Sequence, residues 1–124
     1  MSQIVMKVTN NLRDLLNNSV KSAYHNGELI KDRVSNFLIE IPADRNHGDF
    51  ATNIAMVSAK IFRLSPRKIA EIIVSNLNLD NTMFKKVEIA GPGFINFFLG
   101  ESFYSSILRD IEKLGNNYGR SNYG

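Results

Sequence analysis

The stretch Gly91-Pro92-Gly93-Phe94-Ile95-Asn96-Phe97-Phe98-Leu99 decides the fold, because a glycine-bearing turn leads directly into a strand. Successive side chains of a strand point to opposite faces. One face carries Phe94, Asn96 and Phe98, and the other carries Ile95, Phe97 and Leu99. Only one face needs to meet a core, so the face that holds an amide between two aromatics is a candidate reading surface.

An aromatic plane and an amide two residues apart suit an unstacked nucleobase. Such a base stacks through its flat face and forms hydrogen bonds through its edge. The alternative is that Asn96 fills a solvated strand position beside aromatic residues, which have a high strand preference.

Periodicity predicts the other elements. Apolar residues at helical spacing predict helices over 3–24, 54–62, 66–77 and 103–114. Asn26-Gly27 ends the first helix, Thr52 or Asp49 caps the second, and Ser65-Pro66 starts the third. Alternation predicts a strand over 37–41, which Pro42 ends, and another around 87–89 that forms a hairpin with the Phe94 strand. A polar loop over 43–50 follows the first strand.

These elements predict an α+β fold. We expect a two-layer domain with helices packed on one face of a small antiparallel sheet, in the order helix, strand or strands, helix, helix, hairpin, helix. The domain occupies residues 1–114, and the polar tail over 115–124 is a linker.

Composition places the chain among soluble globular domains. At 124 residues, with 44% hydrophobic and 22% charged residues, it can bury a core without metal or disulfide staples. The absence of cysteine excludes disulfides and thiolate metal sites. A net charge of +3 and a pI near 9.3 favour a polyanionic partner. The sequence carries no basic-then-apolar leader and no apolar run long enough for a membrane span, so we expect a cytoplasmic protein.

The segment from Asp44 to Phe50 is the one stretch that looks catalytic, because it gathers two carboxylates, a histidine and an arginine. A hydrolytic metal site usually needs three protein ligands, and the other histidine, His25, is distant in sequence. We therefore expect no catalytic residue and no metal site. Asp49, Thr52 and Asn53 are interpreted as determinants of the loop and of the next helix start.

Basic residues suggest contacts to phosphate. Gly91-Pro92-Gly93 lacks the glycine spacing, lysine and following helix of a phosphate-binding loop, so it is better interpreted as a tight hairpin. The candidate phosphate contacts are Lys85, Lys86, Arg67 and Lys68. The alternative is that these charges simply solvate exposed surfaces.

Taken together, three ordered motifs resemble the N-terminal additional domain of arginyl-tRNA synthetases. The motifs are Asp44-Arg45-Asn46-His47-Gly48-Asp49-Phe50-Ala51-Thr52-Asn53-Ile54-Ala55, Pro66-Arg67-Lys68-Ile69-Ala70-Glu71 and Val87-Glu88-Ile89-Ala90-Gly91-Pro92-Gly93-Phe94-Ile95-Asn96-Phe97. The resemblance covers essentially the whole chain, although the first helix and residues 78–86 match only in character.

The resemblance implies a domain that holds the elbow of tRNA(Arg). In that family an aromatic and an amide on the last strand contact a base of the D-loop, and these roles correspond to Phe94 and Asn96. Gly91 lies where some relatives have another contacting side chain, so that only a backbone contact remains there. The alternatives are a free-standing RNA-binding module and a dimerisation module that buries Phe94 and Phe98 against a partner.

The resemblance also implies a parent enzyme with a class I catalytic domain in the same polypeptide. The chain has neither the His-x-Gly-His nor the Lys-Met-Ser-Lys-Ser signature, so it holds no cofactor and is not catalytic alone. The parent is expected to use ATP and magnesium to make arginyl adenylate and to transfer the arginine to tRNA(Arg). We expect this part to be a monomer.

Overall fold

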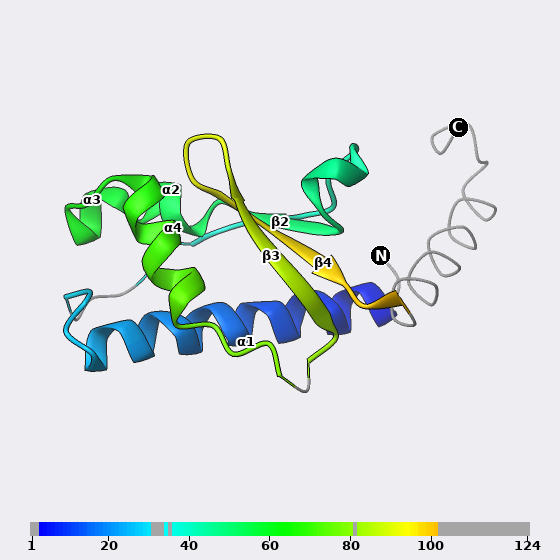
Figure 1. The fold of residues 1–124 in the computed structure, drawn as a ribbon, viewed down its shortest axis with the longest axis horizontal. Coiled ribbons are helices and arrows are strands. Elements are labelled where there is room, and N and C mark those ends of the chain that lie inside the picture. The colour runs from blue at the N-terminus through cyan, green and yellow to red at the C-terminus, as the bar shows by residue number, and fades with distance from the viewer. Residues whose placement is uncertain (1–2, 31–33, 35, 81, 102–124) are drawn as a thin grey trace.

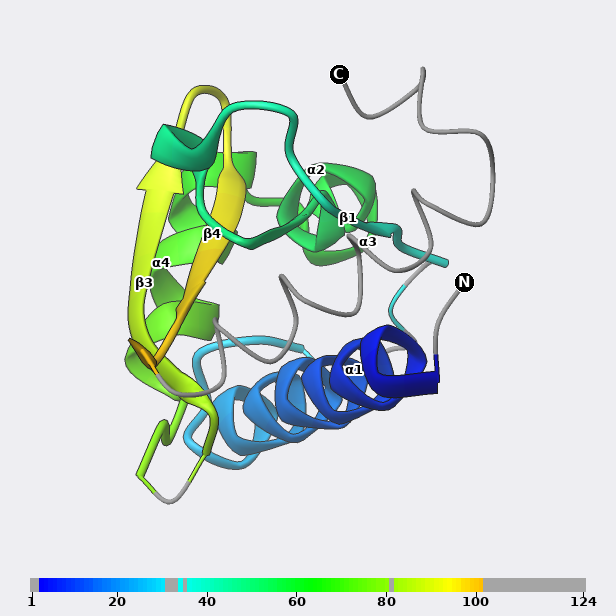
Figure 2. The ribbon, with the colours of Figure 1, turned by 90° about the vertical axis from the view of Figure 1, so that its right-hand side faces the viewer.

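The computed structural model describes residues 3–30, 34, 36–80 and 82–101, which form an α+β domain with a four-stranded antiparallel sheet. Figure 1 shows the long first helix running beneath the sheet, and the turned view in Figure 2 separates the β3 and β4 strands from α2 and α3. The predicted fold class is therefore confirmed. The helix expected over 103–114 and the linker over 115–124 lie outside the described residues.

Helix α1 (Gln3–His25) ends close to its predicted boundary. It buries a stripe at helical spacing that consists of Val5, Val8, Leu12, Leu16, Val20 and Ala23. Gly27 has a φ of +79°, and the amides of Gly27 and Glu28 donate to the carbonyls of Tyr24 and Ala23. These two bonds form a Schellman motif, which explains why the helix ends at this glycine.

The sheet has the strand order β1-β2-β4-β3. The strands are β1 (Ile39–Glu40), β2 (Phe50–Thr52), β3 (Phe84–Ala90) and β4 (Phe94–Leu99). The predicted hairpin of β3 and β4 is confirmed, with Ala90 opposite Phe94. The strand expected over 37–41 forms only at Ile39 and Glu40. Strand β2 is not predicted by the sequence pattern, which places Phe50 at the end of a polar loop and Thr52 at a helix start.

Three shorter helices follow β2: α2 (Ile54–Val57), α3 (Ala59–Phe62) and α4 (Pro66–Ser75). The single helix predicted over 54–62 is divided at Ser58, although the amides of Ser58 and Phe62 still donate four residues back along the chain. Helix α4 begins as predicted, because the Ser65 hydroxyl accepts from the Lys68 amide at 3.2 Å.

The core lies between the sheet and the helices. Phe84 packs edge-on against Phe97, with a distance of 5.4 Å between ring centroids. Buried side chains of α1 and α4 join these aromatics in one hydrophobic cluster. The Ser19 hydroxyl of α1 donates to the Ile73 carbonyl of α4, which connects the two helices inside that core.

Candidate nucleic-acid interface

Strand β4 presents the two faces that its alternation predicts. Ile95, Phe97 and Leu99 are buried in the core. On the other face, here called the outer face, Phe94 is 39% exposed and Phe98 is half-buried. Phe94 is therefore an exposed aromatic ring on a rigid strand, which is a suitable platform for stacking a base.

Asn96 lies on the same face but only 4% of it is exposed. In the segment that leads into β2, Gly48 lies close to the Asn96 Cβ atom and to the Phe97 backbone. A Cβ atom placed on Gly48 would lie 3.3 Å from the Asn96 Cβ and 2.9 Å from the Phe97 carbonyl oxygen. The strand pattern predicted the face of Asn96 correctly, but it could not predict how deeply this residue is buried.

The turn of the hairpin is fastened to the start of α4. The Arg67 guanidinium donates a hydrogen bond of 3.0 Å to the Gly91 carbonyl oxygen. Gly93 has a φ of +139°, and a Cβ atom there would lie 3.0 Å from the carbonyl carbon of Pro66. The Gly91 carbonyl therefore already accepts a hydrogen bond from Arg67, and the turn leading to Phe94 is held in place from α4.

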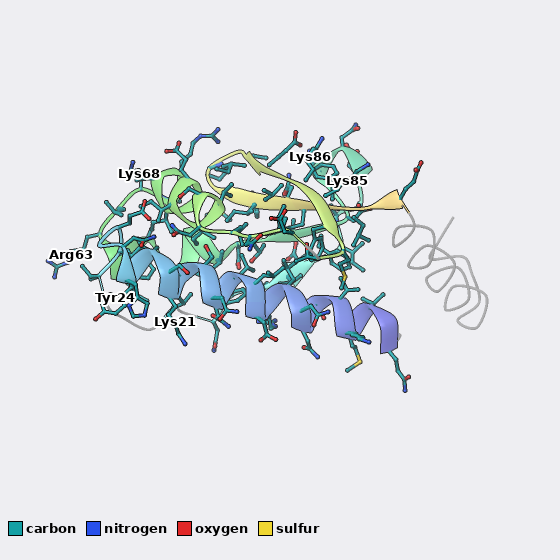
Figure 3. The ribbon with its side chains drawn as sticks, turned by 60° about the horizontal axis from the view of Figure 1, so that its bottom comes forward. Lys21, Tyr24, Arg63, Lys68, Lys85 and Lys86 are labelled. Carbon is teal, nitrogen blue, oxygen red and sulfur yellow. The ribbon has the colours of Figure 1, made fainter. Side chains whose placement is uncertain are left out.

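The four candidate phosphate contacts form two separate groups. Arg67 and Lys68 lie in the first turn of α4, and Lys85 and Lys86 lie in β3. Figure 3 shows Lys68 well apart from Lys85 and Lys86. All four residues are exposed. The sequence could not show this separation, because it depends on how α4 packs against the hairpin.

Lys86 makes two contacts on the outer face. Its ammonium nitrogen lies 4.3 Å from the centroid of the Phe98 ring and 3.4 Å from a carboxylate oxygen of Glu88. The Lys86 ammonium thus covers the ring of Phe98. The sequence analysis had included Phe98 as the second aromatic of the reading surface. Phe94 is therefore the aromatic left open on this part of the described sheet.

Glu88 also lies on the outer face, although the sequence analysis did not include it among the candidate residues. It lies directly opposite Asn96 across the β3–β4 pair, and its side chain is 49% exposed. The sequence does place Glu88 two residues after Lys86, and two such residues of a strand point to the same face. Only the strand register shows that both face the same side as Phe94.

The loop that looked catalytic is tied down by local hydrogen bonds. The Asp44 carboxylate accepts from the Asn46 amide at 2.9 Å, and the Thr52 hydroxyl accepts from the Ile54 amide at 3.3 Å. The Asn53 side chain accepts from the Leu38 amide at 2.8 Å instead of capping α2. Asp49 also caps no helix, because its carboxylate accepts from the Leu99 amide of β4.

The described part of the chain offers no site for a metal ion, since it has no cluster of three or more histidine, cysteine, aspartate or glutamate side chains suited to one. None of the helices among the described residues is both long and apolar enough to cross a membrane.

Comparison with known families gives the geometry a context. The family described as "Arginyl tRNA synthetase N terminal domain" matches residues 10–99 of this chain. The chain belongs to this family. The match includes the outer face, the loop before β2 and the first turn of α4, so the three motifs that suggested the resemblance all lie inside it.

Curated relatives extend the match to the whole chain. An arginine–tRNA ligase of Acetivibrio thermocellus is 44% identical over 124 residues, which is 100% of this chain and 22% of that protein. An arginine–tRNA ligase of Desulforudis audaxviator is 51% identical over 88 residues, covering 71% of this chain and 16% of that protein. The chain thus spans about a fifth of the length of these curated relatives.

A solved structure shares the fold. The arginyl-tRNA synthetase from Plasmodium falciparum superimposes with a TM-score of 0.61 at 21% sequence identity, covering 77% of this chain and 16% of that one. The two proteins therefore share this fold although their sequences have diverged.

Proposed function

We propose that this domain binds the D-loop at the elbow of tRNA(Arg) and positions the tRNA for ATP-dependent arginylation by the rest of a cytoplasmic polypeptide. The observation that carries the proposal is the exposed Phe94 ring, held on β4 by a turn that Arg67 fastens to α4. An aromatic ring on a strand suits an unpaired base of an RNA loop, because such a base can turn outward and stack on the ring without breaking a base pair. Membership of the family and relatives that are arginine–tRNA ligases support this reading.

The basic residues supply the complementary charge. Arg67 and Lys68 lie near the turn that precedes Phe94, and Lys85 and Lys86 lie on the neighbouring strand. Phosphates on either side of a stacked base could therefore meet a cation from a different element. Because these contacts are electrostatic, the affinity should fall steeply as salt is added.

The chemistry of arginylation belongs elsewhere in the proposed parent. The described residues hold no metal-binding cluster, and the 124 residues contain neither class I signature motif. We propose that the residues of this chain contribute by binding and orienting RNA. Arginine and ATP are proposed to bind the catalytic domain of the same polypeptide.

A dimerisation module receives less support from the geometry. The proposed anchors of such an interface were Phe94 and Phe98, but the Phe98 ring lies beneath the Lys86 ammonium. A dry interface would have to displace or bury that charge, which is costly. We therefore propose that the domain is a monomer in solution.

The test is a titration of the 124-residue chain with tRNA(Arg) at low and moderate salt. Phe94→Ala should weaken binding by about 1 to 3 kcal/mol, because it removes the stacking platform. Tyr24→Ala is the matched control, since it deletes an aromatic side chain that is 37% exposed, against 39% for Phe94, but from α1 instead of the outer face. Equal affinity of the wild type and Phe94→Ala would contradict the proposal, and light scattering would reveal a dimer.

A further inference from the structure

Four cations gather where α3 meets α4, and the proposed function uses only two of them. Lys60 lies in α3, Arg63 is the C-cap of that helix, and Arg67 and Lys68 lie in the first turn of α4. All four residues are exposed. Figure 3 shows Arg63 and Lys68 toward the same end of the domain. These four residues are called the junction cations below.

The charge of this junction is largely uncompensated. No aspartate or glutamate occurs between Asp49 and Glu71. Among the described residues, none of the four junction cations forms an ion pair. The Asp49 carboxylate is bonded to the Leu99 amide, and the exposed Glu71 on α4 can offset only one of the four charges. Such a concentration of positive charge favours a polyanionic partner.

The surface around the junction suits a charged backbone better than an apolar partner. No large hydrophobic side chain is exposed among residues 42–80 and 82–93. Protein interfaces centre on aromatic or aliphatic anchors, which this surface lacks. Contacts to RNA phosphates come mainly from arginine and lysine, which this surface has. The chemistry of the junction therefore fits the sugar-phosphate backbone of RNA.

Arg63 has a backbone conformation that its own side chain disfavours. Its φ of +56° and ψ of +39° are left-handed, and no other described residue apart from glycine has a positive φ. Glycine is the usual residue at such a helix end, because a Cβ atom makes this conformation strained. The helix end thus gives no reason for an arginine, and strain of this kind is concentrated at functional sites. The Arg63 guanidinium offers five N–H donors that suit phosphate oxygens.

The junction adjoins the turn that leads to Phe94. The Arg67 guanidinium donates to the Gly91 carbonyl at 3.0 Å. A Cβ atom on Gly93 would lie 3.0 Å from the Pro66 Cβ, so the turn packs directly on the start of α4. An RNA held at Phe94 therefore has its backbone beside α4, and the end of α3 continues the same basic surface.

We infer that the α3–α4 junction binds the sugar-phosphate backbone of the tRNA, and that Lys60 and Arg63 extend this contact beyond the turn at Phe94. Phosphate contacts add affinity and fix orientation without reading the base sequence. The inference takes its RNA ligand from the proposed function, but it does not require a base on Phe94.

The experiment measures the affinity of the 124-residue chain for a tRNA(Arg) transcript at several salt concentrations. Arg63→Gly should weaken binding about threefold to fivefold at low salt, because one phosphate contact is lost. It should reduce the slope of log affinity against log salt concentration by about 0.7 to 0.9. Adding Lys60→Ala should roughly double the change in slope. A transcript with a replaced D-loop sequence should show the same losses, because phosphates carry no sequence information.

Three controls separate the contact from folding and from net charge. Arg63→Gly removes the strained conformation, so its thermal midpoint should be no lower than that of the wild type. Arg63→Lys keeps the charge and should keep the wild-type slope. Lys7→Ala removes an exposed cation from the first two turns of α1, which Figure 1 shows at the opposite end of the domain from α3. Lys7→Ala should leave the slope unchanged.

The outcomes separate this inference from the proposed function. If Phe94→Ala weakens binding while Arg63→Gly keeps the wild-type affinity and slope, the junction is not a contact and the inference is wrong. If Lys7→Ala reduces the slope as much as Arg63→Gly does, the RNA responds only to net charge and the inference is also wrong. If Arg63→Gly reduces the slope while Phe94→Ala changes nothing, the inference stands and the proposed function fails.

Discussion

The Asp49 carboxylate accepts a hydrogen bond of 2.9 Å from the backbone amide of Leu99, so the side chain of the residue just before β2 extends the pairing between β2 and β4. Leu99 is buried, and without Asp49 its amide would lose this partner. The residue expected to cap a helix instead fixes the end of the strand that carries Phe94. Since the Asp49 amide also donates to the Phe97 carbonyl at 2.8 Å, both the backbone and the side chain of Asp49 are bonded to β4.

Asp49→Ala should lower the free energy of unfolding by about 1 to 3 kcal/mol, because it leaves the Leu99 amide unpaired in a buried position. Urea denaturation of the 124-residue chain measures the change. Asp80→Ala, at an exposed position before β3, removes the same charge and should change stability much less. Unchanged stability of Asp49→Ala would show that the hydrogen bond contributes nothing.

Gly48→Ala and Gly27→Ala form a matched pair, since both glycines have positive φ angles of +92° and +79°. A Cβ atom meets nothing within 4 Å at Gly27, but it would lie 2.9 Å from the Phe97 carbonyl oxygen at Gly48. Gly27→Ala should therefore cost about 1 kcal/mol from backbone strain alone. Gly48→Ala should cost more, because the loop must also move, and equal losses in denaturation would refute the close packing.

Ser19→Ala and Ser58→Ala should have opposite effects on stability. Both serines are buried, but the Ser19 hydroxyl donates to the Ile73 carbonyl. The Ser58 hydroxyl finds no hydrogen-bond partner among the described residues. Ser19→Ala should cost about 1 kcal/mol, whereas Ser58→Ala should be neutral or stabilising. A comparable loss in both variants, measured by thermal unfolding, would mean that Ser58 has an unrecognised partner.

Arg67→Ala should loosen the turn that precedes Phe94, because the bond to the Gly91 carbonyl is lost. Hydrogen exchange of the Gly93 amide, which donates to the Ala90 carbonyl across the turn, should become faster. Lys68→Ala removes the neighbouring charge without removing that bond. Faster exchange in both variants, or in neither, would contradict the positioning role of Arg67.

The sequence by itself determined the features that depend on local periodicity. The apolar stripe of α1, the Ser65 cap of α4 and the alternating faces of β4 follow from neighbouring residues, and each was predicted. A strand exposes every second residue to one side whatever it packs against. The exposed ring of Phe94 was therefore accessible to sequence reasoning.

Only the tertiary structure decided which side chains on that face are open. Asn96 is buried beside Gly48, the Gly91 carbonyl accepts from Arg67, and Lys86 lies over Phe98 beside Glu88. The short strand β2 likewise depends on its partners β1 and β4, not on a pattern of its own. Most of these contacts join segments that are distant in the chain. The contact between Lys86 and Phe98 is closer in sequence, but it depends on the register of β3 and β4. The preferences of neighbouring residues therefore could not reveal which groups remain available to a ligand.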